Sequence, residues 1–234
     1  MTQRKTASEQ IDTEISGLYA SAPEPLGFAP EHDLRAFGLR REPGSLLIYS
    51  VSGLGGDSPM FEDLGDISRQ YLNHRHEAAF ISEGLSPPLF VHENERSSVA
   101  ESRPVEGTFS ERHMLDEDFE VIPTPGHTSG ATAFLWETDE HRLLFTGDTI
   151  YLDEGEWGAA VLDQSDRDLY IGSLELIREL DFDVLVPWVA RGLPCYQVTG
   201  EADARRRIDA IIARLRRGEA ADARPPGSIR ETGT

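Results

Sequence analysis

The stretch Val121-Ile-Pro-Thr-Pro-Gly-His-Thr-Ser-Gly130 decides how this chain folds, together with Leu144-Phe-Thr-Gly-Asp148 shortly after it. His127 lies in a glycine-flanked turn, and Asp148 follows a glycine at the end of an apolar run. The residues between the two motifs predict a pair of strands, at 131–137 and 142–147. A histidine and a carboxylate therefore lie at the ends of separate strands, where a sheet can present them to one metal ion.

A second histidine pair lies upstream, in Asn73-His-Arg-His-Glu77. His74 and His76 are two residues apart, so both imidazoles face the same side of an extended segment. Each motif alone has an ordinary alternative: a His-x-His on a surface loop, or an Asp that caps a turn. The order and separation of the motifs favour a metal site formed by His74, His76, His127 and Asp148.

The types of ligand limit the choice of metal. Neutral imidazoles with a carboxylate suit Zn(II), and Fe(II) or Mn(II) as alternatives, whereas a structural cysteine-type zinc site needs thiolates that are missing near these motifs. Cys195 is the only cysteine of the chain. A disulfide framework is thereby excluded and a cytoplasmic location is favoured. The N-terminal residues are polar, and we expect neither a signal peptide nor a transmembrane span.

Composition favours one large domain with a real core. The chain has 234 residues, of which 38% are hydrophobic and 8% aromatic. Its net charge of −20 disfavours nucleic acid and anionic membranes as partners. We therefore expect a small-molecule substrate, and a homo-oligomer stays open. The dense carboxylates suggest a halophilic protein that is adapted to high salt, or else an acidic protein from an arginine-rich, GC-rich genome.

Hydrophobic patterning predicts a chain of strands punctuated and closed by helices. The strands are expected at 34–40, 45–51, 70–72, 88–92, 118–122, 131–137, 142–147 and 184–186. Four helices are expected: at 60–68, at 77–83, after an N-cap at Asp166, and at 201–217. The apolar face of the third helix consists of Leu169, Leu174, Ile177 and Leu180. That of the fourth consists of Ile208, Ile211, Ile212 and Leu215. We expect residues 1–10 to be flexible, residues 11–217 to form the domain, and the tail 218–234 to be disordered. This α/β pattern fits two sheets with helices packed outside.

Four segments together resemble the metallo-β-lactamase-fold superfamily. His74-Arg-His76 stands where that family has His-x-His-x-Asp-His, and Thr124-Pro-Gly-His-Thr-Ser-Gly130 is similar to its Thr-Pro-Gly-His-Thr-x-Gly turn. Phe145-Thr-Gly-Asp148 is similar to its Phe-x-Gly-Asp motif, and Val184-Leu-Val-Pro187 to the strand before its Gly-His-Gly. The resemblance covers roughly residues 33–217. It implies a four-layer αββα sandwich with the site at one edge of the sheets.

The departures from the family pattern fall on the second metal. The second-site Asp and His correspond to Ala78 and Ala79, and the late His falls within Trp188-Val-Ala-Arg191. The family's Asp-x-Gly after the first strands is also missing. The resemblance therefore implies one metal per chain, with Asp148 as a fourth ligand beside the three histidines.

Glu77 lies one residue before the missing second-site Asp. It could act as a ligand or as the general base for a metal-bound water, so Glu77 and Asp148 are the candidate catalytic residues. The alternative is a first-turn glutamate at a helix N-terminus, where a negative charge is favourable.

Three functions stay open at this point. The first is a mononuclear metallo-hydrolase acting on a small ester, thioester or lactam-like substrate. The second is an Fe(II) persulfide dioxygenase-like enzyme that holds iron through His74, His127 and Asp148. The third is a non-catalytic metal-binding or ligand-binding protein.

Other residues carry weaker expectations. Trp188 and Arg191 would line the site, with Arg191 pairing a substrate carboxylate, or Trp188 would only fill the space of the missing metal. Cys195 is expected to be buried. Three histidines without a partner pattern are expected at the surface: His32, His113 and His141.

Overall fold

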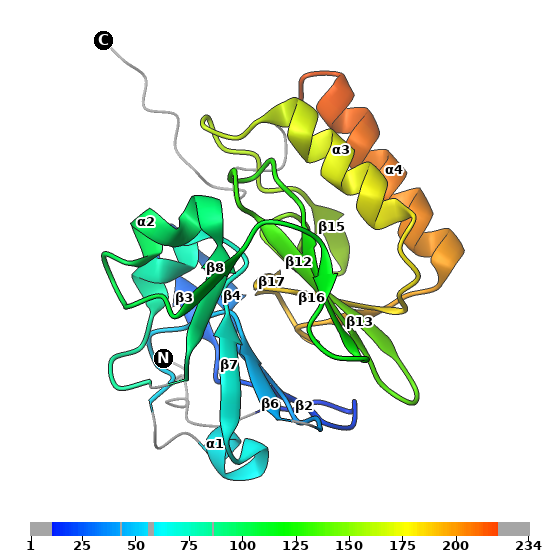
Figure 1. Ribbon diagram of the computed structural model, residues 1–234. Coiled ribbons are helices and arrows are strands. Elements are labelled where there is room, and N and C mark those ends of the chain that lie inside the picture. Colours follow the sequence, from blue (N-terminus) through cyan, green and yellow to red (C-terminus); the bar gives the residue numbers. More distant parts are fainter. Residues whose placement is uncertain (1–10, 43, 56–58, 86, 220–234) are drawn as a thin grey trace, which may run out of the picture.

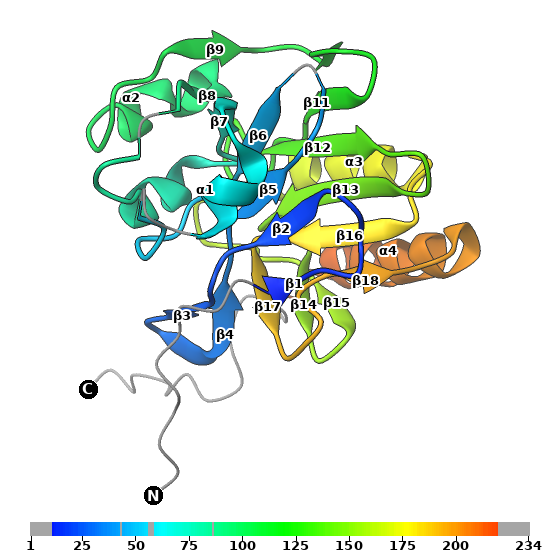
Figure 2. The ribbon, with the colours of Figure 1, turned by 90° about the horizontal axis from the view of Figure 1, so that it is seen from below.

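The computed structural model describes residues 11–219, apart from residues 43, 56–58 and 86. The first ten residues and residues 220–234, for which we expected flexibility and disorder, lie outside this range. Within it, the chain forms an αββα sandwich with a further small sheet (Figures 1 and 2). The predicted α/β fold class is thereby confirmed.

The first layer of the sandwich is a seven-stranded sheet in the order β1-β2-β5-β6-β7-β8-β9. Its strands are β1 (Ile11–Asp12), β2 (Leu18–Ala20), β5 (Phe37–Leu39), β6 (Ser45–Ile48), β7 (Ile67–Tyr71), β8 (Leu89–His92) and β9 (Gly107–Phe109). From β6 to β9 the strands run parallel. Helices α1 (Pro59–Leu64) and α2 (Arg96–Val99) pack on this sheet.

The second layer is a six-stranded sheet in the order β10-β11-β12-β13-β16-β18. Its strands are β10 (His113–Met114), β11 (Phe119–Pro123), β12 (Thr132–Glu137), β13 (Arg142–Gly147), β16 (Val184–Pro187) and β18 (Gln197–Val198). Helices α3 (Arg167–Arg178) and α4 (Glu201–Arg216) lie side by side over its outer face (Figure 1). A third sheet, in the order β15-β14-β17-β4-β3, consists of β3 (Glu24–Leu26), β4 (Ala29–Leu34), β14 (Tyr151–Asp153), β15 (Glu156–Gly158) and β17 (Val189–Arg191).

Aromatic side chains from the two large sheets form the centre of the core. The Phe37 ring of β5 meets Phe145 of β13 edge to face, with the centroids 6.1 Å apart. Tyr71 of β7 lies 5.6 Å from Phe119 and 5.3 Å from Phe134, measured between centroids. Each large apolar side chain buried in this way stabilises the fold by about 1.5–3 kcal/mol. The sheets are thus held face to face by contacts between residues far apart in the sequence.

The strand predictions hold in the middle of the chain and shift near its start. The pair predicted at 131–137 and 142–147 is confirmed as β12 and β13. The strand predicted at 45–51 ends at Ile48, because Tyr49 adopts a left-handed φ of 67° that breaks the extended backbone. The helix predicted at 77–83 is instead the 3-10 helix η1 (Arg75–Phe80).

The helices predicted after Asp166 and at 201–217 are confirmed as α3 and α4, whereas the helix predicted at 60–68 ends at Leu64, because Ile67 and Ser68 belong to strand β7. The Asp166 carboxylate caps α3, accepting the Leu169 N–H at 3.0 Å. Leu169 itself is 48% exposed, so its assignment to the apolar face was wrong. Its neighbour Tyr170 is buried in its place. The four residues predicted for the apolar face of α4 are buried: Ile208, Ile211, Ile212 and Leu215.

Strand direction brings the motif-bearing loops to one edge of the sandwich. β11 and β13 are both antiparallel to β12, so they run in the same direction, and β16 is parallel to β13. Their carboxyl ends therefore lie at one edge of the six-stranded sheet. The loop after β7 meets this edge from the other sheet, where Thr132 N–H donates to the Asn73 carbonyl at 3.0 Å.

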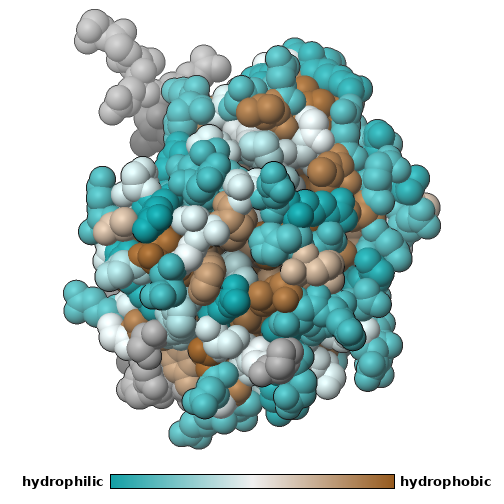
Figure 3. Space-filling view, viewed as in Figure 1, coloured by the Kyte–Doolittle hydropathy of each residue, from teal (hydrophilic) through white to brown (hydrophobic). Residues whose placement is uncertain are grey.

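The surface is largely hydrophilic, as the 27% of charged residues predicts (Figure 3). Apolar side chains are scattered over the face that Figure 3 shows. Within the described residues, none of the helices has the length and apolar character needed to span a bilayer.

Candidate metal centre

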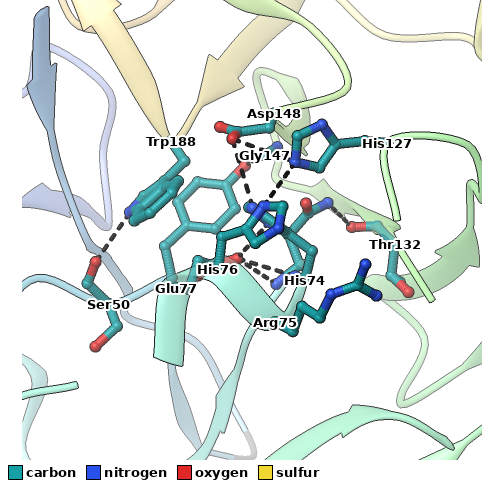
Figure 4. A network of polar contacts seen from close by, with 12 residues as sticks. Ser50, His74, Arg75, His76, Glu77, His127, Thr132, Gly147, Asp148 and Trp188 are labelled. Atoms are coloured by element: carbon teal, nitrogen blue, oxygen red, sulfur yellow. Dashed lines mark hydrogen bonds and ion pairs between the residues drawn. The ribbon is translucent and has the colours of Figure 1, made fainter. Parts of the chain in front are cut away.

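Four predicted side chains meet where the two large sheets join (Figure 4). His74 and His76 come from the segment after β7, His127 from the turn after β11, and Asp148 from the end of β13. One ligand atom from each of the four lies within 4.8 Å of the other three. Three separate segments, drawn from both sheets, therefore contribute to one cluster.

The distances within this cluster suit a single metal ion. His76 Nδ1 lies 3.1 Å from His127 Nε2. Asp148 Oδ2 lies 3.4 Å from His74 Nε2 and 3.5 Å from His127 Nε2. A zinc ion with bonds of 2.0–2.2 Å in tetrahedral geometry places its ligand atoms about 3.3–3.6 Å apart. The two distances from Asp148 fall within that range, and the distance between His76 and His127 is slightly shorter.

The backbone around His127 requires a glycine. Gly126 has a φ of +143°, and a Cβ there would lie 2.3 Å from the Tyr170 Cα atom. The turn is therefore packed directly on the first turn of α3. His127 Nδ1 donates to the Ala160 carbonyl at 2.6 Å. In the neutral ring Nε2 then carries no proton, and its lone pair is available to the cluster.

Asp148 is held by its backbone neighbours. Gly147 has a φ of +55°, and a Cβ there would lie 2.1 Å from the Asn73 side chain. The Tyr49 hydroxyl accepts the Gly147 N–H at 2.7 Å and donates to the Val186 carbonyl at 2.8 Å. The ends of β13 and β16 are thus fixed together, and Asp148 follows this junction.

Glu77 lies behind His74, away from the ligand atoms. Its Oε1 accepts the N–H groups of Asn73 at 2.7 Å and His74 at 3.1 Å, and lies 3.3 Å from His74 Nδ1. The side chain is fully buried and is not part of the four-residue cluster. The structure therefore does not bring Glu77 together with the four candidate ligands, and its role as ligand or general base stays a prediction. Its carboxylate caps the start of η1 and orients the His74 ring, close to the helix N-terminus alternative.

The three histidines of the cluster have different pKa values, because burial and neighbouring charges act on each of them differently. Burial opposes a charge on His74, but the carboxylates of Asp148 and Glu77 outweigh it and raise the pKa of His74 to about 9. Burial and then the charge of His74 lower the pKa of His76 and of His127 to about 4. Burial also disfavours the Asp148 carboxylate, yet the histidines, His74 first, keep its pKa below the ordinary value. Two imidazoles are therefore neutral and the carboxylate is ionised at neutral pH.

The residues present fit a divalent metal. The fit rests on three imidazoles and one carboxylate, on the hydrogen bond that fixes the His127 tautomer, and on Asp148 Oδ1, which is buried without a hydrogen-bond partner in the described residues. Hard and borderline divalent ions such as Zn(II), Fe(II) and Mn(II) accept this donor set.

The positions expected for second-metal ligands hold apolar groups. Ala78 is half-buried and Ala79 is exposed, and neither side chain can bind a metal. The Trp188 indole is buried and packs edge to face with the His74 ring, with the ring centroids 5.5 Å apart. Its Nε1 donates to the Ser50 carbonyl at 2.9 Å. Of the two alternatives for Trp188, filling the space agrees with this burial.

Arg191 does not reach toward the cluster. Its Nη1 lies 3.2 Å from Asp153 Oδ1 and its Nη2 lies 3.1 Å from Glu154 Oε1. The guanidinium is neutralised by these two carboxylates within and beside the third sheet. The expectation that it pairs a substrate carboxylate does not match this placement.

Predictions for the remaining single residues had mixed outcomes. Cys195 is buried, as expected. His32 is also buried, with Nε2 3.8 Å from Asp153 Oδ1, so its assignment to the surface was wrong. His141 is half-buried, and its ring hydrogen-bonds the Asp183 carboxylate at 2.8 Å.

Sequence reasoning missed the tyrosines that support the cluster. Tyr49 follows an apolar strand and has the pattern of a core residue, and Tyr170 lies one position beyond a predicted apolar residue. The Tyr170 hydroxyl lies 3.0 Å from the Asp148 carbonyl and 2.8 Å from that of Thr149. Such contacts across the fold leave no local sequence signal.

Solved structures share this fold at low sequence identity. A metallo-beta-lactamase from Pontibacter korlensis superposes with a TM-score of 0.64 and 15% identity, covering 89% of this chain and 99% of that one. A hydrolase of the beta lactamase superfamily, AbOPH, gives 0.62 and 14%, covering 86% and 96%. A Thermus thermophilus protein of the metallo-beta-lactamase family gives 0.55 and 19%, covering 88% and 81%. These likenesses bear on the fold.

Sequence comparison points to the same group. The hydroxyacylglutathione hydrolase of Erwinia tasmaniensis is 28% identical over 116 residues, which cover 49% of this chain and 43% of that protein. The chain thus matches less than half the length of this relative. Residues 57–187, more than half of the chain, match the family model that represents the metallo-beta-lactamase superfamily. Together with the αββα sandwich and the His/Asp cluster at its edge, this match means that the chain belongs to the metallo-beta-lactamase superfamily.

Proposed function

We propose that this protein is a hydrolase that uses one divalent metal ion, with zinc as the first candidate, to cleave a small ester, thioester or lactam-like substrate. The observation that carries the proposal is the convergence of His74, His76, His127 and Asp148 within 4.8 Å. Family membership supports hydrolysis as the reaction class.

The residues divide the work of such a reaction. A divalent ion bound here supplies Lewis acidity, which polarises a carbonyl and lowers the pKa of a bound water towards ~7. The three histidines would hold the ion through His74 Nε2, His76 Nδ1 and His127 Nε2. Asp148 would contribute Oδ2, and its unpartnered Oδ1 would accept a hydrogen bond, and then the proton, from the attacking water. Glu77 and the Ala160 carbonyl keep two of the imidazoles in the orientation that binding needs.

The residues around the cluster support the proposal of a single ion. Ala78 and Ala79 offer no ligand atoms, and the buried Trp188 indole lies against the edge of His74. A second ion would need ligands on this side, and neither alanine nor tryptophan supplies one. Hydrolysis here would therefore proceed without the second ion that two-metal enzymes use to clamp the attacking and leaving oxygens.

A thioester is the substrate class to test first. The relative from Erwinia tasmaniensis is named for the hydrolysis of hydroxyacylglutathione, a thioester. Carbonyl polarisation serves thioesters, esters and lactams alike, so the assay needs all three. The proposed substrates are a hydroxyacylglutathione, an aryl ester and a β-lactam.

The deciding experiment is metal content per chain, measured on protein purified without added metal and on the His127→Ala variant. We expect about one metal ion per chain in the wild type, loss of it in the variant, and hydrolysis of one of the three substrates that falls with it. A His113→Ala variant, altered away from the cluster, should retain the metal and the activity.

Other results would overturn the proposal. Two ions per chain would show that further residues build a second site. Absence of metal even after reloading would favour the non-catalytic alternative. Oxygen uptake by iron-loaded protein with glutathione persulfide, without hydrolysis, would favour the dioxygenase alternative.

A further inference from the structure

A buried carboxylate outside the ligand cluster joins two of the segments that carry ligands. Glu95 belongs to the 3-10 helix η2 (Glu93–Glu95), which follows β8, and is only 1% exposed. Its Oε2 accepts the N–H of Arg75 at 3.0 Å, and its Oε1 accepts the N–H of Gly130 at 2.6 Å. Arg75 lies between two proposed ligands, and Gly130 ends the turn that carries a third. One side chain therefore binds both segments.

The surroundings of Glu95 are built for this contact. A Cβ on Gly130 would lie 2.6 Å from Glu95 Cγ and 2.7 Å from Oε1, so only glycine lets the carboxylate approach. The Arg75 guanidinium lies 3.5 Å from Oε2 and balances the buried charge. A buried carboxylate is stable only with such partners, and hydrogen bonds from backbone N–H groups to it are short and strong.

We propose that Glu95 is a positioning residue, which fixes the His74–His76 segment against the His127 turn and so sets the distances between the ligand atoms before a metal binds. The inference deepens the proposed function, on which it rests for the identity of the site as a metal centre. Groups behind metal ligands commonly set affinity in this way. Glu95 binds two segments, whereas Glu77 and Ala160 each orient one ring.

The amide Glu95→Gln tests the role with the smallest change in shape. Two backbone N–H groups need two acceptor oxygens, and a glutamine offers one oxygen and one NH2 group. One of the two segments must then lose its partner and face a second donor. Glu93→Gln is the matched control, because Glu93 lies in the same short helix and is exposed.

Titration with Co(II) reports on the ligand geometry, and its visible absorption depends on the arrangement of the ligands. We expect Glu95→Gln to bind Co(II) about 10- to 100-fold more weakly than the wild type and to show a changed absorption spectrum at saturation. Glu93→Gln should match the wild type in both. If Glu95 only stabilised the fold, the variant would unfold more readily, yet its Co(II) affinity and spectrum would stay those of the wild type; that result would overturn the proposal.

Amide hydrogen exchange on metal-free protein tests the same inference without any ion. We expect the N–H groups of Arg75 and Gly130 to exchange slowly in the wild type and in Glu93→Gln, and at least one of them to exchange at least tenfold faster in Glu95→Gln. Unchanged exchange at both would overturn the inference. A wild type that binds no metal would defeat the proposed function, and the exchange result would still decide whether Glu95 fixes the two segments.

Discussion

At the scale of single residues, three of the four side chains of the cluster are supported by a partner group outside the cluster. The His127 ring donates to the Ala160 carbonyl, and the His74 ring lies against the Glu77 carboxylate. The residue before Asp148 donates its N–H to the Tyr49 hydroxyl. Tyr49 adopts its left-handed φ of 67° at a position where a bulky side chain is strained. Its hydroxyl joins the ends of two strands, accepting the Gly147 N–H of β13 and donating to the Val186 carbonyl of β16.

The raised pKa of His74 gives a prediction for protein kept metal-free with a chelator. The pKa of this group is about 9 in the folded chain against an ordinary value of 6.5, because Asp148 and Glu77 outweigh the effect of burial. The protonated ring therefore stabilises the fold fully below pH 6.5, and this contribution disappears as the pH rises through 9. We expect the free energy of unfolding to fall by on the order of 1–3 kcal/mol across that window.

Denaturant titrations at several pH values check this loss of stability. His74→Gln should abolish most of the slope between pH 6.5 and 9, because the amide does not titrate. A wild-type stability that stays level over the window would refute the charged state of His74.

At the scale of elements, the N-terminus of α3 supports the turn that carries His127. The Asp166 N–H donates to the Gly126 carbonyl at 2.9 Å, and Ser165 Oγ donates to the His127 carbonyl at 3.0 Å. Ser173 Oγ donates to the Pro125 carbonyl at 2.6 Å. The helix and the turn therefore form one packed unit.

Removal of the α3 cap should loosen this unit. Asp166→Ala leaves the Leu169 N–H without its acceptor, and we expect a loss of about 1 kcal/mol in the free energy of unfolding together with weaker metal binding. Urea denaturation and a metal titration measure the two effects. Asp163→Ala, an exposed change in the preceding turn, should leave both within the error of the wild type; equal effects of the two variants would count against a capping role.

The sequence predicted the elements with strong local patterns and missed those fixed by distant contacts. The strands around residues 131–147 and the apolar face of α4 follow from alternation and helical spacing. The end of β6 at Ile48 depends on the Tyr49 hydroxyl bond to β16, and the burial of Tyr170 in place of Leu169 depends on the Asp148 loop. His127 and Asp148 were recognisable because they lie in turn motifs with glycine, and His74 and His76 because they are two residues apart. Glu95 had no such signal, since its partners are backbone groups from other segments.

At the scale of the whole molecule, charge dominates the surface. Twenty-two basic residues face 42 acidic ones, so many carboxylates have no cation to pair with. Exposed pairs such as Arg205 with Glu201 at 3.2 Å contribute little each and do not offset the excess. Mutual repulsion of like charges opposes the compact state, and salt screens it over a Debye length of about 3 Å at 1 M.

Added KCl should therefore stabilise the protein. We expect the unfolding midpoint to rise by several degrees between low salt and about 1 M KCl, with most of the gain at the lower concentrations, where screening changes fastest. Thermal unfolding followed by circular dichroism, on chelator-treated protein, measures it without interference from metal binding. A midpoint that is level or falls over this range would argue against adaptation to high salt and for an ordinary acidic protein.

The origin of the four ligand atoms in two different sheets has a consequence for the newly made chain. A nascent chain that has emerged only through β7 and the segment after it offers His74 and His76 alone, a weak pair that any extended peptide could present. His127 and Asp148 appear later in synthesis, and they reach the pair only when the second sheet docks on the first. If the proposed ion binds, its tight capture would come at the end of folding and would not start it. A bound ion would then mark a chain whose two sheets have docked.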